Sequence, residues 1–155
     1  MDFGASKRGV SMGPLAIRHA DIKSKISDMG LIYRDMGDII PMTEGADNRN
    51  RNDGDMIVEA NSRLFARVSE SLKAGAFPVI LGGDHSVAAG SIPAVAEYCG
   101  DIGLIWIDAH GDFNDDKSTK SGNMRSAYAS KQLAKSELIT YGFRVYRNCK
   151  ASLKH

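Results

Sequence analysis

The sequence has few cysteines, no long apolar run and almost no net charge, and each absence excludes a class of protein. Two cysteines, Cys99 and Cys149, are too few for a disulfide framework and fit a reducing, cytoplasmic environment. No run of about 18 apolar residues offers a membrane span, and the polar residues 1–4 lack the apolar core of a signal peptide. A net charge of +1 gives no reason to expect a nucleic-acid or membrane partner.

The composition otherwise suits one globular domain with an uneven distribution of charge. The 155 residues are 43% hydrophobic, which is enough to bury a core. Residues 117–155 hold nine Lys or Arg and a single acid, Glu137, whereas the preceding residues are acidic on balance. We therefore divide the chain into an α/β part over residues 1–123 and a basic tail of uncertain fold over residues 124–155.

The spacing of apolar residues predicts helices that alternate with short strands. A stripe of apolar residues after Gly13 and Pro14 predicts a first helix that ends at Gly30, and Gly75 is placed to close a second. Apolar strands between amphipathic helices favour a three-layer, Rossmann-like parallel sheet with helices on both faces. The predicted helices cover residues 13–30, 56–74 and 86–98, the strands cover 31–40, 77–81 and 102–107, and a polar loop covers 44–55.

Two polar motifs follow two of the predicted strands directly. Residues 82–86 read Gly-Gly-Asp-His-Ser, and residues 108–112 read Asp-Ala-His-Gly-Asp. Ligands of open α/β sheets bind beyond the carboxyl ends of the strands, so both motifs are expected in one crevice. Either motif alone is more often an ordinary turn or loop than a ligand site. Their occurrence at two strand ends, separated by one crossover, favours a shared site.

The residue types in these motifs suit a metal centre. In an extended segment Asp108, His110 and Asp112 point to one side, and His85 adds a second imidazole from the neighbouring strand end. Carboxylates with imidazoles suit manganese better than a thiolate or three-histidine set, which would favour zinc. A bridging Asp108 would hold two divalent ions, which together lower the pKa of a shared water.

The motifs resemble those of the arginases, in the ureohydrolase superfamily, over about residues 1–123. The resemblance is carried by three segments of the sequence. They are Arg-Gly-Val-Ser-Met-Gly-Pro at residues 8–14, Gly-Gly-Asp-His-Ser at 82–86, and Trp-Ile-Asp-Ala-His-Gly-Asp-Phe-Asn at 106–114. The resemblance implies an arginase/deacetylase-like α/β fold. It also implies that the intact proteins of the family are cytoplasmic homo-oligomers. The implied reaction converts L-arginine and water to L-ornithine and urea by a metal-bridging hydroxide.

The same resemblance implies roles for individual residues. His85, Asp108 and Asp112 would bind one manganese ion of a binuclear site, and His110 with Asp108 the other. Asp112 would also be catalytic, because it accepts a hydrogen bond from the bridging hydroxide and orients it toward the guanidinium carbon. Recognition of the α-amino acid head group would fall to three neutral polar side chains, whose hydrogen bonds suit both a carboxylate and an ammonium. These substrate-binding residues are Asn114, Ser121 and Asn123.

The sequence departs from the family pattern after residue 123. Arg125 stands where the family has a proton-shuttling histidine, and an arginine cannot act as a base near neutral pH. The later family motif Ser-x-Asp-x-Asp is not present, so we expect a truncated sheet, a frame disruption after residue 123 and little activity of the chain alone. Two alternatives stay open: a non-catalytic oligomerisation or regulatory partner of intact ureohydrolases, and an agmatinase-like hydrolase of another guanidino compound.

Overall fold

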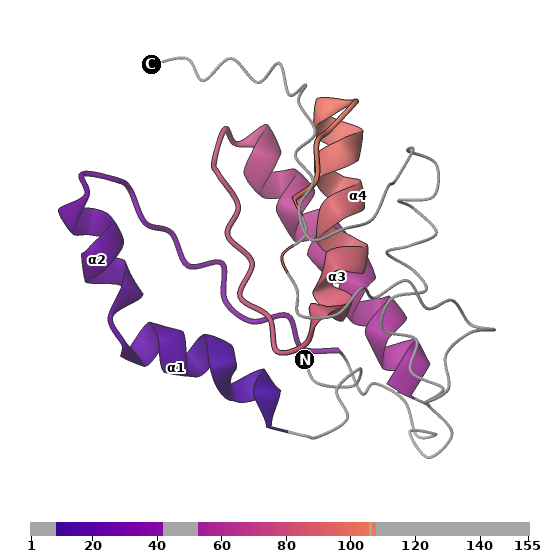
Figure 1. Cartoon of the computed structure of the whole chain (residues 1–155), viewed down its shortest axis with the longest axis horizontal. Helices are drawn as coiled ribbons and strands as arrows, with labels where there is room; N and C mark the ends of the chain where they lie inside the picture. Colours follow the sequence, from indigo (N-terminus) through magenta and orange to yellow (C-terminus); the bar gives the residue numbers. More distant parts are fainter. Residues whose placement is uncertain (1–8, 42–52, 106, 108–155) are drawn as a thin grey trace.

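The computed structural model describes residues 9–41, 53–105 and 107, and the regular secondary structure of this part is helical. In Figure 1 the short helices α1 and α2 lie apart from the longer pair α3 and α4. Extended segments of the chain lie between the two pairs. The elements are η1 (Val10–Met12), α1 (Gly13–His19), α2 (Ile22–Asp28), α3 (Asp53–Lys73), η3 (His85–Val87) and α4 (Ala88–Cys99).

The core of the described part lies between α3 and α4. Leu64 and Val68 of α3 are buried together with Ala94 of α4. Their spacing on α3 places them on one helical face, which α4 covers. Two residues of the extended segments, Ile39 and Ile80, pack against this cluster. The two long helices therefore cover one side of the extended segments.

The structure confirms the predicted helices over residues 56–74 and 86–98 and corrects their starts. The helix α3 begins at Asp53, inside the predicted polar loop, and its end is marked by Gly75 with a φ of 74°. Such a positive φ is strained for other residues, which explains the glycine at this position. The second helix is preceded by one 3-10 turn, η3, before α4 begins at Ala88.

The predicted single helix over residues 13–30 is wrong, because the structure breaks it into α1 and α2. The break falls at Asp21, which adopts a left-handed φ of 60°. Its carboxylate accepts a hydrogen bond from the backbone N–H of Ser24 at 3.3 Å. Asp21 therefore begins α2 as an N-cap, a role that aspartate favours over a place inside a helix. The predicted end at Gly30, with a φ of 75°, is confirmed.

The three predicted strands are extended segments without sheet pairing in the described residues. Residues 31–41, 76–82 and 102–105 carry no strand assignment, and no backbone hydrogen bond joins one of these segments to another. Ile39 and Ile80 face the helices, whereas Ile32 is 99% exposed, Phe77 88% and Ile107 80%. Apolar side chains thus lie on both sides of the extended segments, but only one side is covered within the described part.

Candidate functional site

The first predicted motif forms a tight turn between the extended segment 76–82 and α4. Asp84 has an extended backbone, with φ −114° and ψ 167°, and caps η3. Its Oδ1 atom accepts hydrogen bonds from the backbone N–H of Ser86 at 2.9 Å and from the Ser86 hydroxyl. Ser86 is buried. The Asp84 carboxylate is thus directed back into the turn, which shapes the backbone that carries His85.

His85 is the predicted metal ligand that lies in this turn. It is the first residue of η3, its side chain is partly buried, and its Nε2 atom is shielded from solvent. Both α3 and α4 contact η3, so the histidine is attached to the best-packed part of the described structure. A side chain on such a rigid support suits a ligand, because little ordering is required when an ion binds.

Two glycines, Gly82 and Gly13, show what lies against the turn. A β-carbon on Gly82 would lie 3.0 Å from a methyl group of Val87, which explains the absence of a side chain there. A β-carbon on Gly13 would lie 3.6 Å from the Gly82 carbonyl oxygen, at ordinary van der Waals distance. The first residue of α1 therefore lies against the start of the turn. Two of the three segments that carry the arginase resemblance meet at this contact.

The remaining predicted site residues lie outside the described residues. Within the described part, no group of three or more His, Cys, Asp or Glu side chains could hold a metal ion. The joining of the two motifs into one site therefore stays a prediction. The residues concerned are Asp108, His110, Asp112, Asn114, Ser121 and Asn123.

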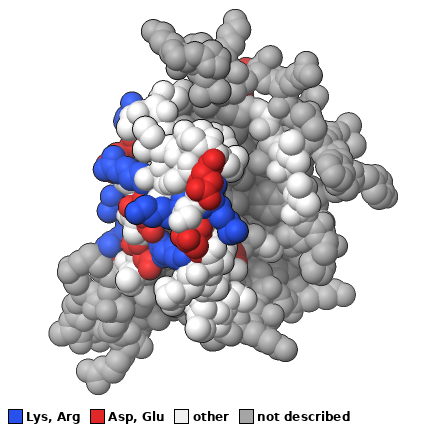
Figure 2. Space-filling view, turned by 90° about the vertical axis from the view of Figure 1, so that its left-hand side faces the viewer, with Lys and Arg blue, Asp and Glu red and all other residues white. Residues whose placement is uncertain are grey.

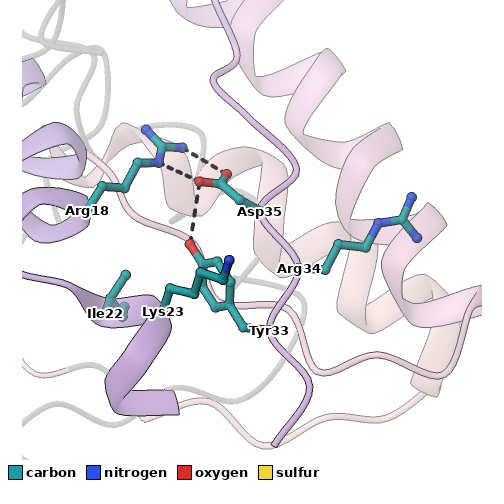
Figure 3. Close-up of a pocket in the computed structure, with 6 residues that line it drawn as sticks. All are labelled: Arg18, Ile22, Lys23, Tyr33, Arg34 and Asp35. Carbon is teal, nitrogen blue, oxygen red and sulfur yellow. Dashed lines mark hydrogen bonds and ion pairs between the residues drawn. The ribbon is translucent and has the colours of Figure 1, made fainter. Parts of the chain in front are cut away.

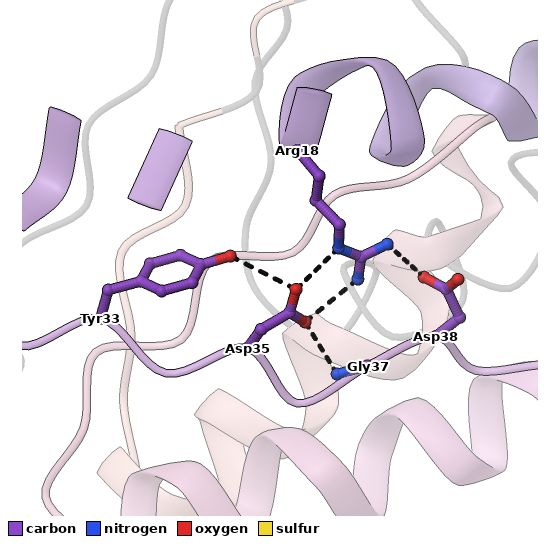
Figure 4. Close-up of polar contacts among 5 residues, drawn as sticks. All are labelled: Arg18, Tyr33, Asp35, Gly37 and Asp38. Carbon is purple, nitrogen blue, oxygen red and sulfur yellow. Dashed lines mark hydrogen bonds and ion pairs between the residues drawn. The ribbon is translucent and has the colours of Figure 1, made fainter. Parts of the chain in front are cut away.

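Sequence reasoning missed a charged network centred on Arg18. The guanidinium donates to both carboxylate oxygens of Asp35, from Nε at 2.8 Å and from Nη2 at 3.1 Å. Its Nη1 atom donates to Asp38 at 2.6 Å (Figure 4). Asp35 also accepts hydrogen bonds from the backbone N–H of Gly37 at 2.8 Å and from the Tyr33 hydroxyl at 3.4 Å. The network connects α1 to the segment 31–41 through contacts 17 and 20 residues apart in sequence.

The network borders a surface cavity of about 470 Å³. Figure 3 shows Arg18 and Tyr33 directed toward Asp35, whereas Arg34 is directed away from them. Figure 2 shows that Lys and Arg side chains are interspersed with Asp and Glu on this face of the molecule. Opposite charges in such a mixture neutralise one another, so the face has no strong field of one sign. The cavity is lined by Arg18, Ile22, Lys23, Tyr33, Arg34 and Asp35.

The charges of the network shift the pKa values of its members. The hydrogen bond from Arg18 is the main cause that lowers the pKa of Asp35, and the N–H of Gly37 adds to it. The hydrogen bonds to Asp35 and then Asp38 raise the pKa of Arg18. A carboxylate with a lowered pKa stabilises the folded state at neutral pH. This contribution is lost as the pH falls through the folded-state pKa.

The Asp35→Asn variant should therefore be less stable than the wild type at neutral pH. The difference should shrink as the pH falls below 3.8, the usual pKa of an aspartate, because the wild-type carboxylate then becomes protonated. Urea midpoints measured by circular dichroism across this range test the expectation. Asp28→Asn, at the exposed end of α2, controls for the loss of one charge. A difference between wild type and Asp35→Asn that does not change with pH would contradict the ion-pair explanation.

Comparison with known proteins decides the family. A model described as the Arginase family matches residues 1–154. The chain belongs to the arginase family. The predicted resemblance to the arginases is thereby confirmed. Solved arginases with a similar structure support the α/β fold class, whereas the predicted sheet is not paired in the described residues. The match to the family model continues through the basic residues 124–154. The division of the chain at residue 123 stays a prediction.

The similarity between this chain and individual arginases extends over less than half of the length of those arginases. The arginase of Brevibacillus brevis is 44% identical over 126 residues, which are 80% of this chain and 42% of that protein. The solved arginase of Bacillus caldovelox has a TM-score of 0.74 at 39% identity, covering 86% of this chain and 46% of that one. The arginase of Bacillus subtilis gives 0.72 at 38% identity, covering 86% and 44%. The chain thus spans less than half the length of the arginases it matches.

The longest described helix, α3, has one apolar face, which is buried against α4, and charged residues elsewhere. In the part of the chain that the structure describes, no helix is both long and apolar enough to cross a membrane.

Proposed function

We propose that this chain is a guanidino hydrolase of the arginase type, which converts L-arginine and water to L-ornithine and urea with manganese. The observation that carries the proposal is the family match over residues 1–154, which includes a turn that holds His85 on a rigid helical support. A cytoplasmic location and homo-oligomeric assembly belong to the same proposal.

The donor groups of the turn fit a manganese ion. The Asp84 carboxylate bonds to Ser86, so the His85 imidazole is the group that this turn offers to a metal. We assign the other ligands to Asp108, His110 and Asp112, a set of oxygen and nitrogen donors that suits manganese. Bound manganese would lower the pKa of a water at this site. Asp112 would orient this water by accepting its hydrogen bond.

The substrate proposal rests on neutral polar side chains. Asn114, Ser121 and Asn123 would bind the α-carboxylate and α-ammonium of arginine through hydrogen bonds that need no formal charge on the protein. Agmatine lacks the α-carboxylate, so it would leave some of these groups without a partner. Such unpaired groups discriminate strongly between substrates. L-arginine is therefore the proposed substrate and agmatine the alternative.

Manganese titration by calorimetry tests the metal site directly. We expect a heat of binding in the wild type that His85→Ala weakens and Asp108→Ala abolishes, because Asp108 is proposed to contact both ions. His19→Ala is the matched control, since His19 is an exposed histidine at the end of α1, and it should bind manganese like the wild type. A wild type without a manganese-specific heat, or an unchanged heat in Asp108→Ala, would contradict the site.

Urea release provides the second measurement, with L-arginine and agmatine compared under the same manganese load. Release from L-arginine alone would support the proposed substrate, whereas release from agmatine alone would favour the alternative. Asn114→Ala and Asn123→Ala should lower any arginine-dependent release mainly by raising KM, because these residues are proposed to bind the substrate.

A further inference from the structure

The Arg18 network and the His85 turn lie at opposite ends of the same short helix. Arg18 is near the C-terminal end of α1, where Asp35 and Asp38 hold it. Gly13 is the first residue of α1 and lies against the Gly82 carbonyl at the start of the turn. A helix held at one end transmits its position to the other, because its backbone hydrogen bonds make it stiff.

The geometry at Arg18 is specific for a guanidinium. One edge of the planar group, Nε and Nη2, donates to both oxygens of Asp35, while Nη1 donates to Asp38. Asp35 itself accepts a hydrogen bond of 2.8 Å from the N–H of Gly37, a residue with a positive φ of 74°, and a longer one of 3.4 Å from the Tyr33 hydroxyl. A lysine has one ammonium group and cannot reproduce this arrangement. The network thus fixes the direction of the Arg18 side chain and with it the end of α1.

We propose that Arg18 is a positioning residue for the metal-binding turn. By anchoring α1 to the segment 31–41, it holds Gly13 against Gly82 and thereby fixes the backbone from which His85 extends. Arg18 has no contact with the proposed metal or substrate groups among the described residues. The inference rests on the proposed function only in taking His85 as a metal ligand.

Two variants of Arg18 test the proposal by the position of His85 and by manganese affinity. Arg18→Ala removes the guanidinium. Arg18→Lys keeps the positive charge but lacks the planar group that donates to both oxygens of one carboxylate. We expect both to shift the imidazole resonances of metal-free His85 in proton–carbon NMR spectra, assigned with His85→Asn. We also expect manganese binding to weaken about tenfold, the lower end of the effect of residues that support metal ligands. Arg67→Ala is the matched control, because Arg67 forms an exposed ion pair with Glu70 within α3.

Chemical rescue makes the test specific for the guanidinium. Arg18→Ala leaves the two carboxylates and Tyr33 around an empty space, which free guanidinium at millimolar concentration should enter. The His85 resonances and the manganese affinity should then return toward wild-type values, whereas sodium at the same ionic strength should have no such effect. Equal responses to both cations would overturn the proposal.

The outcomes separate this inference from the proposed function. If the wild type binds no manganese, the proposed function fails, but the metal-free resonances of His85 still test the role of Arg18. Wild-type resonances and affinity in Arg18→Ala would overturn the positioning role even if the variant were less stable. If Arg18→Ala does not fold, Arg18→Lys provides the same two measurements.

Discussion

Leu64→Ala is expected to lower the free energy of unfolding by about 2–5 kcal/mol. Leu64 is 8% exposed and lies in the cluster with Val68 and Ala94 where α3 meets α4. The truncation removes buried apolar contacts and leaves a cavity, because neighbouring side chains relax only in part. Urea unfolding followed by the helical circular dichroism signal measures the change.

A second position on the same helix provides the control. Val58 is 48% exposed, so Val58→Ala should change the free energy of unfolding by less than about 0.5 kcal/mol. Because domains are stable by only about 5–15 kcal/mol, Leu64→Ala can leave little folded protein. Leu64→Met conserves volume and should cost less than about 1.5 kcal/mol, which keeps the series measurable. Equal losses at Leu64 and Val58 would show that α4 does not cover this face of α3.

The long helices were predictable because their signals are local. The apolar stripe of α3 includes Leu64 and Val68, and the structure buries both. The break at Asp21 had a weaker signal: Ile17 and Ile22 are five residues apart, which departs from helical spacing. An aspartate that caps its own third neighbour competes with helix continuation. The stripe was visible in the sequence, whereas this competition depends on backbone geometry.

An apolar run in the sequence can indicate an extended segment but not its pairing with another strand. The run 77–81 predicts an extended, apolar segment, and the structure has one, with Ile80 toward the helices. Strand pairing, however, requires a partner backbone at hydrogen-bonding distance, and the partner is chosen by tertiary structure. Sequence periodicity therefore predicted the extended conformation, but it could not determine the pairing of the strands. The predicted cover on both faces is seen on one side only within the described part.

The candidate site also has one part that the sequence predicts and one part that it does not. Gly82 to Ser86 form a turn that is specified locally, by Asp84 and the small residues around it, and the sequence singled it out. Arg18 bonds Asp35 and Asp38, which lie far from it in the sequence and have no distinctive spacing relative to it. Ion pairs between distant residues leave no periodic pattern, because either partner is equally typical of a solvated surface. Only the fold shows that these charges meet.

Gly90→Ala is expected to lower the free energy of unfolding by about 1–3 kcal/mol, the usual cost of overpacking. A β-carbon on Gly90 would lie 2.5 Å from the backbone carbonyl oxygen of Asn61 and 2.9 Å from its side-chain Oδ1. Asn61 is 7% exposed and is fixed by a hydrogen bond of 2.9 Å from Nδ2 to the Ile57 carbonyl. The clash involves backbone, so α4 must move away from α3. This loss should exceed the gain of about 1 kcal/mol that alanine brings to a helix.

Gly13→Ala is the matched control, because Gly13 is also helical but has only an ordinary 3.6 Å contact at its β-carbon position. It should leave the free energy of unfolding unchanged or raise it by up to about 1 kcal/mol. Since α4 follows η3 directly, displacement of α4 by Gly90→Ala should also move His85 and weaken manganese binding, measured by calorimetry at a temperature where the variant is folded. An increase in stability for Gly90→Ala equal to that of Gly13→Ala would contradict the close crossing of α3 and α4. A destabilised variant with unchanged manganese affinity would show that the turn keeps its geometry without this crossing.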